Sequence, residues 1–292
     1  MISAARRRTP HSWGWIARTI LHYPIIYGLC LLVGTAVMLP FIWTLSSSLK
    51  PPGAAISFPP KFIPDPVQWV NYPMVFRMIP FLTFFKNSVI VTSIAVVGEV
   101  FSASLVAYAF ARRRFPGRDV MFAIVLATMM VPYPVTMVPT FVMFTYLHFV
   151  NTFLPLILPA WFGPAFSIFL LRQFFRTINM DLDEAAKVDG AGDFLIYSRI
   201  ILPLAKPALA TVAIFSAMAY WNDFLNPLIY LSDREKFTLA VGINFLRNFR
   251  SGSDTFPIQM AASVMFVAPC ILLFFLAQRN IVQGIVTTGL KG

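Results

Sequence analysis

Charged residues are scarce in this chain: Asp, Glu, Lys and Arg make up 12% of its 292 residues. A soluble globular domain has about a quarter of its residues charged. Hydrophobic residues account for 58% of the chain, and its mean hydropathy is +0.73. Because so little charge cannot cover a water-facing surface, we expect the solvent of this protein to be largely lipid.

Cysteine is almost absent, and the motifs of common enzymes are missing. Cys30 and Cys270 both lie inside apolar runs, which excludes a disulfide framework and a cysteine metal site. The sequence contains no G-x-x-x-x-G-K-[ST] phosphate-binding loop, no Ser/His/Asp set and no metal-ligand spacing. We therefore expect a chain that is not an enzyme, holds no cofactor or metal, and does not hydrolyse ATP by itself.

Basic residues outnumber acidic ones, and the formal net charge is +11. That balance fits a nucleic-acid binder or a membrane protein. The basic residues form short clusters that flank long apolar runs, namely Arg6–Arg8, Arg112–Arg114 with Arg118, and Arg172 with Arg176. The positive-inside rule expects such flanks in cytoplasmic loops, whereas a nucleic-acid binder gathers its charge on one folded face. The distribution therefore favours a membrane protein.

Six apolar runs are long enough to cross a bilayer, which takes roughly 20 helical residues. Backbone groups in lipid must be paired internally, so these runs predict helices and an all-α membrane fold with six transmembrane helices. The first run is too long for a signal peptide and predicts an uncleaved helix. The runs are 24–45, 87–110, 119–141, 153–172, 206–230 and 257–279.

The distribution of Lys and Arg predicts the orientation. With the N-terminus inside, 15 basic residues fall in cytoplasmic segments and 8 outside, which favours two cytoplasmic termini. We divide the chain into residues 1–86 (N-terminal tail, first helix and external segment), 87–282 (a core with five transmembrane helices) and 283–292 (a cytoplasmic tail).

Prolines crowd the external segment, residues 47–85, and they predict an ordered irregular stretch rather than a long helix. The segment is either a docking surface for an external partner or an interfacial loop anchored by aromatic residues. Prolines in the third and fourth runs also have two interpretations: they break the helices to form gating elements, or they are ordinary packing kinks. The external prolines are Pro51, Pro52, Pro59, Pro60, Pro64, Pro66, Pro73 and Pro80, and the aromatic residues are Trp69, Tyr72, Phe76 and Phe81. The prolines inside the runs are Pro132, Pro134, Pro139, Pro155, Pro159 and Pro164.

Residues 181–203, between the fourth and fifth runs, predict two short helices set at an angle. Asp181 and Glu184 have the spacing of a capping box that opens the first helix, and Gly190 can take the left-handed conformation that ends it. Asp193 predicts the N-cap of a second helix that runs to Ile201 and ends at Pro203.

The small side chains Ala185 and Ala186 on the first of these helices would let another backbone approach closely. The segment is therefore suited to fit a groove on a partner, and the alternative is an amphipathic loop on the membrane surface.

The spaced pattern in this segment resembles the EAA motif of permeases of binding-protein-dependent ABC importers. It consists of Glu184-Ala185-Ala186, Asp189-Gly190-Ala191 and Ile200-x-Leu202-Pro203. Three further stretches are similar to carbohydrate-uptake permeases: Ala107–Arg112 with Phe115–Arg118, Trp221–Phe224 with Pro227, and Gln278–Arg279 with the terminal Gly289–Gly292. Together they resemble the MalG-like subunit, from the second run to the end of the chain. Asn179 replaces a proline frequent in the family, and we expect Asp181 to compensate by capping.

The resemblance implies a type I ABC importer permease in the cell membrane of a bacterium or archaeon. The implied partners are a MalF-like permease, two ATP-binding subunits that hold ATP and Mg, and an extracytoplasmic solute-binding protein. The implied solute is a sugar, an oligosaccharide, or a related polyol or glycerophosphate. Residues 181–203, called the coupling segment below, would dock into a groove of an ATP-binding subunit. Glu184 would hold the first helix and meet polar groups of that groove, and Gly190 would set the angle between the helices.

Three polar residues in or beside the runs are candidates for the translocation path: Glu99, Asn222 and Asp223. A charge at the centre of a membrane helix costs about 3 kcal/mol, so Glu99 should face protein or water. It therefore lines the path or is a paired or protonated structural group, and Asp223 either lines the path or simply reaches water. One helical face carries Glu99 together with Ser88, Thr92, Ala95 and Ser102.

Two competing functions remain at this point. An ion-coupled secondary transporter would use Glu99 and Asp223 as proton carriers, but it leaves the EAA-like pattern unexplained. A membrane-embedded enzyme would need a catalytic set that the sequence does not show.

Overall fold

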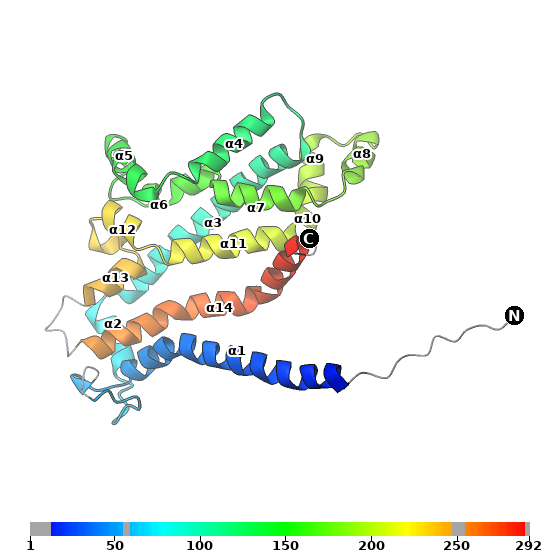
Figure 1. Cartoon of the computed structure of the whole chain (residues 1–292). Helices are drawn as coiled ribbons and strands as arrows, with labels where there is room; N and C mark the ends of the chain where they lie inside the picture. Colours follow the sequence, from blue (N-terminus) through cyan, green and yellow to red (C-terminus); the bar gives the residue numbers. More distant parts are fainter. Residues whose placement is uncertain (1–12, 55–58, 247–254, 290–292) are drawn as a thin grey trace.

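The computed structural model describes residues 13–54, 59–246 and 255–289, and every regular element in these ranges is a helix (Figure 1). The cluster Arg6–Arg8 and the terminal residues 290–292, which entered the sequence predictions, lie outside the described residues. The last helix continues to Gly289, so the tail predicted from residue 283 is helical for most of its length.

Five helices lying side by side form the body of the molecule (Figure 1). They are α1 (Trp13–Ser48), α3 (Phe81–Arg112), α7 (Ala165–Phe175), α11 (Lys206–Trp221) and α14 (Phe256–Gly289). Helix α3 packs against α7 and α11, and α14 packs against α11 and α1. The runs predicted over 24–45, 87–110 and 257–279 lie inside α1, α3 and α14, so these three predictions are confirmed.

The third and fourth runs are broken at prolines. The third consists of α4 (Arg118–Thr128) and α5 (Tyr133–Tyr146), which are bent by 95° at a break that contains Pro132. The fourth consists of α6 (Leu154–Ile157), the 3-10 turn η2 (Leu158–Phe162) and α7. Pro155 and Pro159 lie in the first turn of α6 and η2, and Pro164 precedes α7, because the first turn of a helix does not need the missing N–H.

The fifth run is not a single helix, contrary to the prediction over 206–230. Helix α11 ends at Trp221, and α12 (Leu225–Tyr230) begins after a three-residue break. The Asp223 carboxylate accepts bonds from the Asn226 backbone N–H (3.2 Å) and side-chain amide (2.8 Å), and so satisfies a free donor at the start of α12. Among the described residues, four helical stretches are long and apolar enough to span a membrane: Tyr23–Ser48, Phe81–Arg112, Leu154–Phe175 and Phe256–Gln278. The number rises to six if the bent pair of α4 and α5 and the bent pair Asp193–Leu204 and Lys206–Trp221 each form one span.

The external segment folds onto the bundle, and its described part includes the helix α2 (Asn71–Met78). The Asn71 amide donates to the carbonyls of Ser48 (2.8 Å) and Lys50 (2.9 Å), which ties the end of α1 to α2. Phe81, one of the aromatic residues expected near the outer interface, is buried in a core cluster that also contains Phe84 and Leu239, so its ring is not exposed to lipid. That cluster joins α2, α3 and α14 to the short helix α13 (Leu239–Phe245), and it includes Phe237, which directly follows the 3-10 turn η4 (Arg234–Lys236).

Candidate functional site

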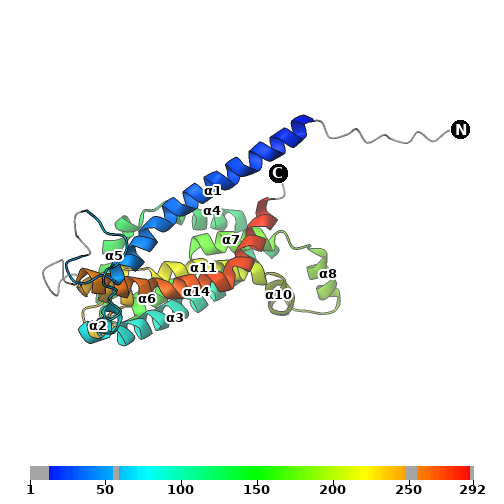
Figure 2. The same cartoon turned by 90° about the horizontal axis from the view of Figure 1, so that it is seen from below.

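The coupling segment projects from the end of the bundle that lies away from α2 (Figure 2). It consists of α8 (Asp181–Val188), α9 (Asp193–Ile196), the π-helical turn η3 (Tyr197–Ile201) and α10 (Leu202–Leu204). Beneath it lies a second core cluster formed by buried side chains of α3, α7, η3 and α11, including Ala107, Phe175 and Ile201. The segment is therefore continuous with the packed interior of the bundle.

Helix α8 begins differently from the predicted capping box. The Asp181 and Glu184 side chains do not cap it; instead the Asp181 N–H donates to Asn179 Oδ1 (3.1 Å), and the Asn179 amide donates to the Asp181 carboxylate (2.9 Å). An asparagine two residues ahead can satisfy the first free donor of a helix in this way. Asn179, which stands where the family often has a proline, thus caps the helix itself.

The end of α8 confirms the prediction for Gly190, which has φ +80°. The Gly190 N–H donates to the Lys187 carbonyl (3.0 Å), and the Ala191 N–H donates to the Ala186 carbonyl (2.9 Å). These two bonds form a Schellman motif, in which the residue after the helix needs a positive φ.

The second half of the segment corrects two predictions. Asp193 is not the N-cap of α9: the Gly192 carbonyl accepts the first N–H groups, while the Asp193 carboxylate pairs with Arg113. The helix also does not stop at Pro203 but continues to Leu204 and then bends by 78° into α11. Pro203 has no N–H to bond the carbonyl four residues earlier. The helix accommodates this by widening into the π-helical turn η3 and does not end there.

A buried ion pair anchors α8 to the end of α3. Arg112 Nη2 lies 2.6 Å and Nε 3.2 Å from the two carboxylate oxygens of Asp183, and the side chains are 1% and 3% exposed. Arg112 also donates to the carbonyls of Ile178 (2.6 Å) and Asn179 (2.9 Å). The sequence prediction missed this pair. Two features of the sequence could have indicated it. Arg112 ends the long apolar run of α3, and Asp183 lies three residues before the small Ala186, on the same face of α8.

The outer face of the coupling segment is exposed. Glu184, Ala185, Asp189, Gly190 and Pro203 are exposed, and Ile200 and Leu202 are half-buried. Ala186 was expected to be exposed but is buried (9% exposed), because it shares the inner face of α8 with Asp183.

Large apolar side chains are exposed on the same outer face, and the sequence prediction missed them. Val188 is 88% and Phe194 72% exposed, and the others are Leu182 and Leu195. Clustered exposed apolar side chains of this kind mark interaction surfaces.

Glu99 lies inside the helix bundle rather than on its surface. It is 6% exposed, and its carboxylate accepts hydrogen bonds from the hydroxyls of Ser167 and Tyr220, the latter at 2.7 Å. These partners belong to α7 and α11, so the carboxylate joins three helices. Of its two expected roles, the structure shows the paired one.

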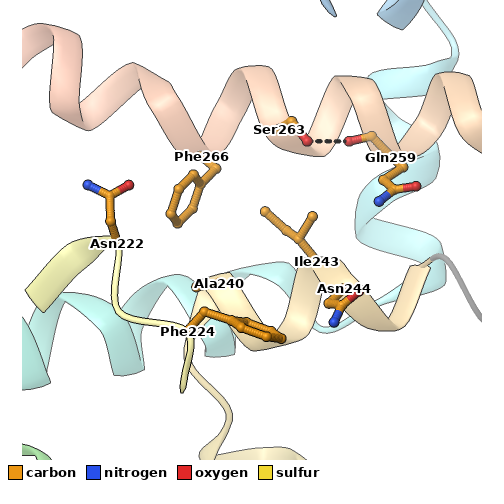
Figure 3. A pocket seen from close by; sticks show the side chains of 8 residues that line it. All are labelled: Asn222, Phe224, Ala240, Ile243, Asn244, Gln259, Ser263 and Phe266. Atoms are coloured by element: carbon orange, nitrogen blue, oxygen red, sulfur yellow. Dashed lines mark hydrogen bonds between the residues drawn. The ribbon is translucent and has the colours of Figure 1, made fainter. Parts of the chain in front are cut away.

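Asn222 and Asp223 differ in their surroundings. Asn222 lines a cavity of about 400 Å³ between α13, α14 and the break after α11 (Figure 3). Asp223 is not part of its lining and instead holds the start of α12. The cavity is lined by Asn222, Phe224, Ala240, Ile243, Asn244, Gln259, Ser263 and Phe266. No cluster of metal-ligating side chains occurs among the described residues.

Residues 100–287 match the family described as "Binding-protein-dependent transport system inner membrane component". The chain belongs to this family. The permease is therefore a multi-pass component of the inner membrane, and ATP hydrolysis takes place on separate subunits. The matched range begins within α3 and includes the coupling segment.

Relatives of the permease include transport proteins with named solutes. It is 36% identical over 210 residues to the arabinooligosaccharides transport system permease protein AraQ of Halalkalibacterium halodurans, covering 72% of this chain and 74% of the relative. It is 34% identical over 258 residues to the diacetylchitobiose uptake system permease protein NgcG of Streptomyces coelicolor, covering 88% and 85%.

A solved structure agrees with the permease over nearly its whole length. A chain of a bacterial ABC transporter involved in the import of the acidic polysaccharide alginate superposes with a TM-score of 0.79 and 25% identity. The match covers 93% of the permease and 99% of that chain. The all-helical permease fold is thus shown.

Proposed function

We propose that this permease is the MalG-like subunit of an ATP-driven importer for a sugar, an oligosaccharide or a related solute. Relatives with an arabinooligosaccharide and a diacetylchitobiose in their names support this solute class. The proposed partners are a MalF-like permease, two ATP-binding subunits that carry ATP and Mg, and an extracytoplasmic solute-binding protein. In this arrangement six spans and two cytoplasmic termini place the coupling segment inside the cell.

The exposed outer face of the coupling segment is the observation that carries the coupling role. Val188 and Phe194 offer apolar contact area, Glu184 offers a carboxylate at the rim, and Ala185 leaves room for a partner backbone. A groove on an ATP-binding subunit would bury these side chains. The Arg112–Asp183 pair would then pass movement of the partner to α3, and the continuous chain through α10 would pass it to α11.

Closure of the two ATP-binding subunits on ATP would move the permease pair from inward-facing to outward-facing, and hydrolysis would reset it. This is alternating access, in which the solute path opens to one side at a time. Glu184, Ala185, Ala186, Asp189, Gly190, Ile200, Leu202 and Pro203 form the proposed coupling site.

We assign Asn222 to the solute path, because it lines the cavity with polar and aromatic side chains (Figure 3). Amide groups both donate and accept hydrogen bonds, which suits sugar hydroxyls, and phenylalanine rings can pack on the apolar face of a sugar ring. The helix break after α11 opens the backbone where the cavity lies, as in other transporters with discontinuous helices. Glu99 and Asp223 would shape this path indirectly, through the helices they hold.

The test is co-purification of the tagged chain with the products of neighbouring genes, followed by ATPase measurement in lipid with and without the solute-binding protein. Val188→Glu and Glu184→Lys should abolish stimulation while the chain still inserts in the membrane. Solute transport by the chain alone, without any ATPase, would refute the proposal.

A further inference from the structure

Three arginines act electrostatically on one carboxylate at the end of the bundle that carries the coupling segment, and one of them contacts it directly. Asp119 is attracted by Arg118, Arg172 and Arg176, and the Arg118 Nε lies 3.0 Å from its carboxylate. Arg172 is repelled by both Arg118 and Arg176. The cluster therefore holds three positive charges against one negative charge, and an anion from outside would reduce the repulsion between the arginines.

Arg172 is the member whose position needs the most explanation. It lies in the last turn of α7, is 8% exposed, and its guanidinium lies 3.9 Å from the ring centre of Phe122. Its Nε donates to the Phe110 carbonyl at 3.3 Å, but its two terminal nitrogens have no partner within the described part of the chain. Those nitrogens are not sealed inside the protein either. A largely buried guanidinium thus presents free donors at the protein surface.

The surroundings of the cluster place it at the edge of a lipid-facing surface. Next to it, a cavity of about 340 Å³ is lined by Arg114, Phe115, Gly117, Arg118, Asp119 and Val120. The following turns of α4 expose apolar side chains from Val120 to Ala127, among them Val120 (66%), Met121 (53%) and Ile124 (60%). The surface changes from charged to apolar within one turn of α4. Such a boundary is expected at the level of the lipid headgroups of a bilayer.

We infer that this cluster binds the phosphate group of an anionic phospholipid. Guanidinium groups match phosphate oxygens in a two-pronged geometry, and basic pockets between membrane helices bind acidic headgroups. The acyl chains would lie along the exposed apolar side chains of α4. A docked ATP-binding subunit fits this surface less well, because the apolar face beside it belongs in lipid and the exposed face of the coupling segment lies on other helices.

The experiment uses the complete transporter complex in nanodiscs with equal amounts of phosphatidylcholine and phosphatidylglycerol. After transfer to detergent and purification, mass spectrometry counts the lipids that remain bound. The unaltered complex should retain phosphatidylglycerol over phosphatidylcholine, and each removed arginine should lower that preference about fivefold. The variants are Arg176→Gln, Arg118→Gln with Arg176→Gln, and Arg172→Gln.

Two controls separate a local site from the general positive charge of this end. Arg199→Gln removes an exposed arginine of η3 at the same end and should leave lipid retention unchanged. The Arg176 side chain is exposed and makes no hydrogen bond or close ion pair within the described residues, only the longer-range attraction to Asp119, so its replacement does not threaten the fold. Equal retention of both lipids, or equal loss in Arg199→Gln and Arg176→Gln, would overturn the inference. Displacement of the lipid by millimolar inorganic phosphate would assign the cluster to a free anion instead.

Discussion

Arg112 and Asp183 form an almost fully buried ion pair although they lie 71 residues apart in the sequence. Arg112 is the last residue of α3, and Asp183 lies in the first turn of α8. The pair therefore makes the base of the coupling segment part of the helix bundle. A segment held in this way can transmit force to α3, whereas a freely hinged loop could not.

Removing one partner of this pair should destabilise the permease strongly, since it leaves the other charge buried and unpaired. We expect Asp183→Ala to cost about 3–5 kcal/mol and Arg112→Lys to lose the two-pronged contact. Thermal unfolding of the complex in detergent measures both changes. The double variant Arg112→Met with Asp183→Leu should be more stable than either single charge deletion, yet poor in stimulated ATPase activity.

The exposed pair Asp233–Lys236 is the matched control, because its two side chains are 56% and 41% exposed. Lys236→Gln should leave the melting temperature nearly unchanged. A melting temperature of Asp183→Ala equal to that of the unaltered complex would contradict the anchoring role.

Replacing Gly190 should weaken coupling, because its φ of +80° is strained for any residue with a Cβ. Gly190→Ala should cost about 1–2 kcal/mol in the Schellman turn and reduce stimulated ATPase activity. Gly192→Ala, two residues on, has ordinary backbone angles and open space around the added methyl group, so it should behave like the unaltered protein. Equal activity in the two variants would show that the turn does not set the geometry of the segment.

The sequence predicted the long helices well because an apolar run of sufficient length leaves no other structure in lipid. It predicted the stop at Gly190 because few other residues accept that backbone conformation. It did not predict which carboxylate faces inward, since Asp183 and Glu184 are adjacent and have similar chemistry. Only the packing of α8 against Arg112 decides that Asp183 is buried and Glu184 exposed.

The caps were mispredicted for a related reason. Asp181 and Asp193 have the residue type of an N-cap, but competing partners were near: the Asn179 side chain for one and Arg113 for the other. The break after Trp221 was missed because Asn222, Asp223 and Phe224 interrupt an apolar run too briefly to change its average hydropathy. Specific side-chain partners, both near and far along the chain, thus decided the details that residue type alone left open.

Gly98 should tolerate no larger side chain, since it faces the indole of Trp161. A Cβ at position 98 would lie 2.2 Å from the Trp161 Nε1 atom, well inside van der Waals contact. Gly98→Ala should therefore destabilise the permease by about 1–3 kcal/mol through overpacking between α3 and η2. Gly34→Ala in α1 meets nothing within 4 Å and is the control for the helical glycine itself. Similar melting temperatures for the two variants would mean that the indole moves aside at little cost.

Glu99 offers the clearest discrimination between the importer and an ion-coupled transporter. In the importer its carboxylate serves as a hydrogen-bond acceptor between three helices, so Glu99→Gln, which keeps the shape and one acceptor, should retain most solute uptake. Tyr220→Phe should cost about 1–3 kcal/mol, because it removes a donor from a buried carboxylate. Uptake into proteoliposomes containing ATP, with and without a protonophore, measures the first effect. If Glu99→Gln abolished uptake while its melting temperature stayed unchanged, proton transfer through this carboxylate would be part of the mechanism.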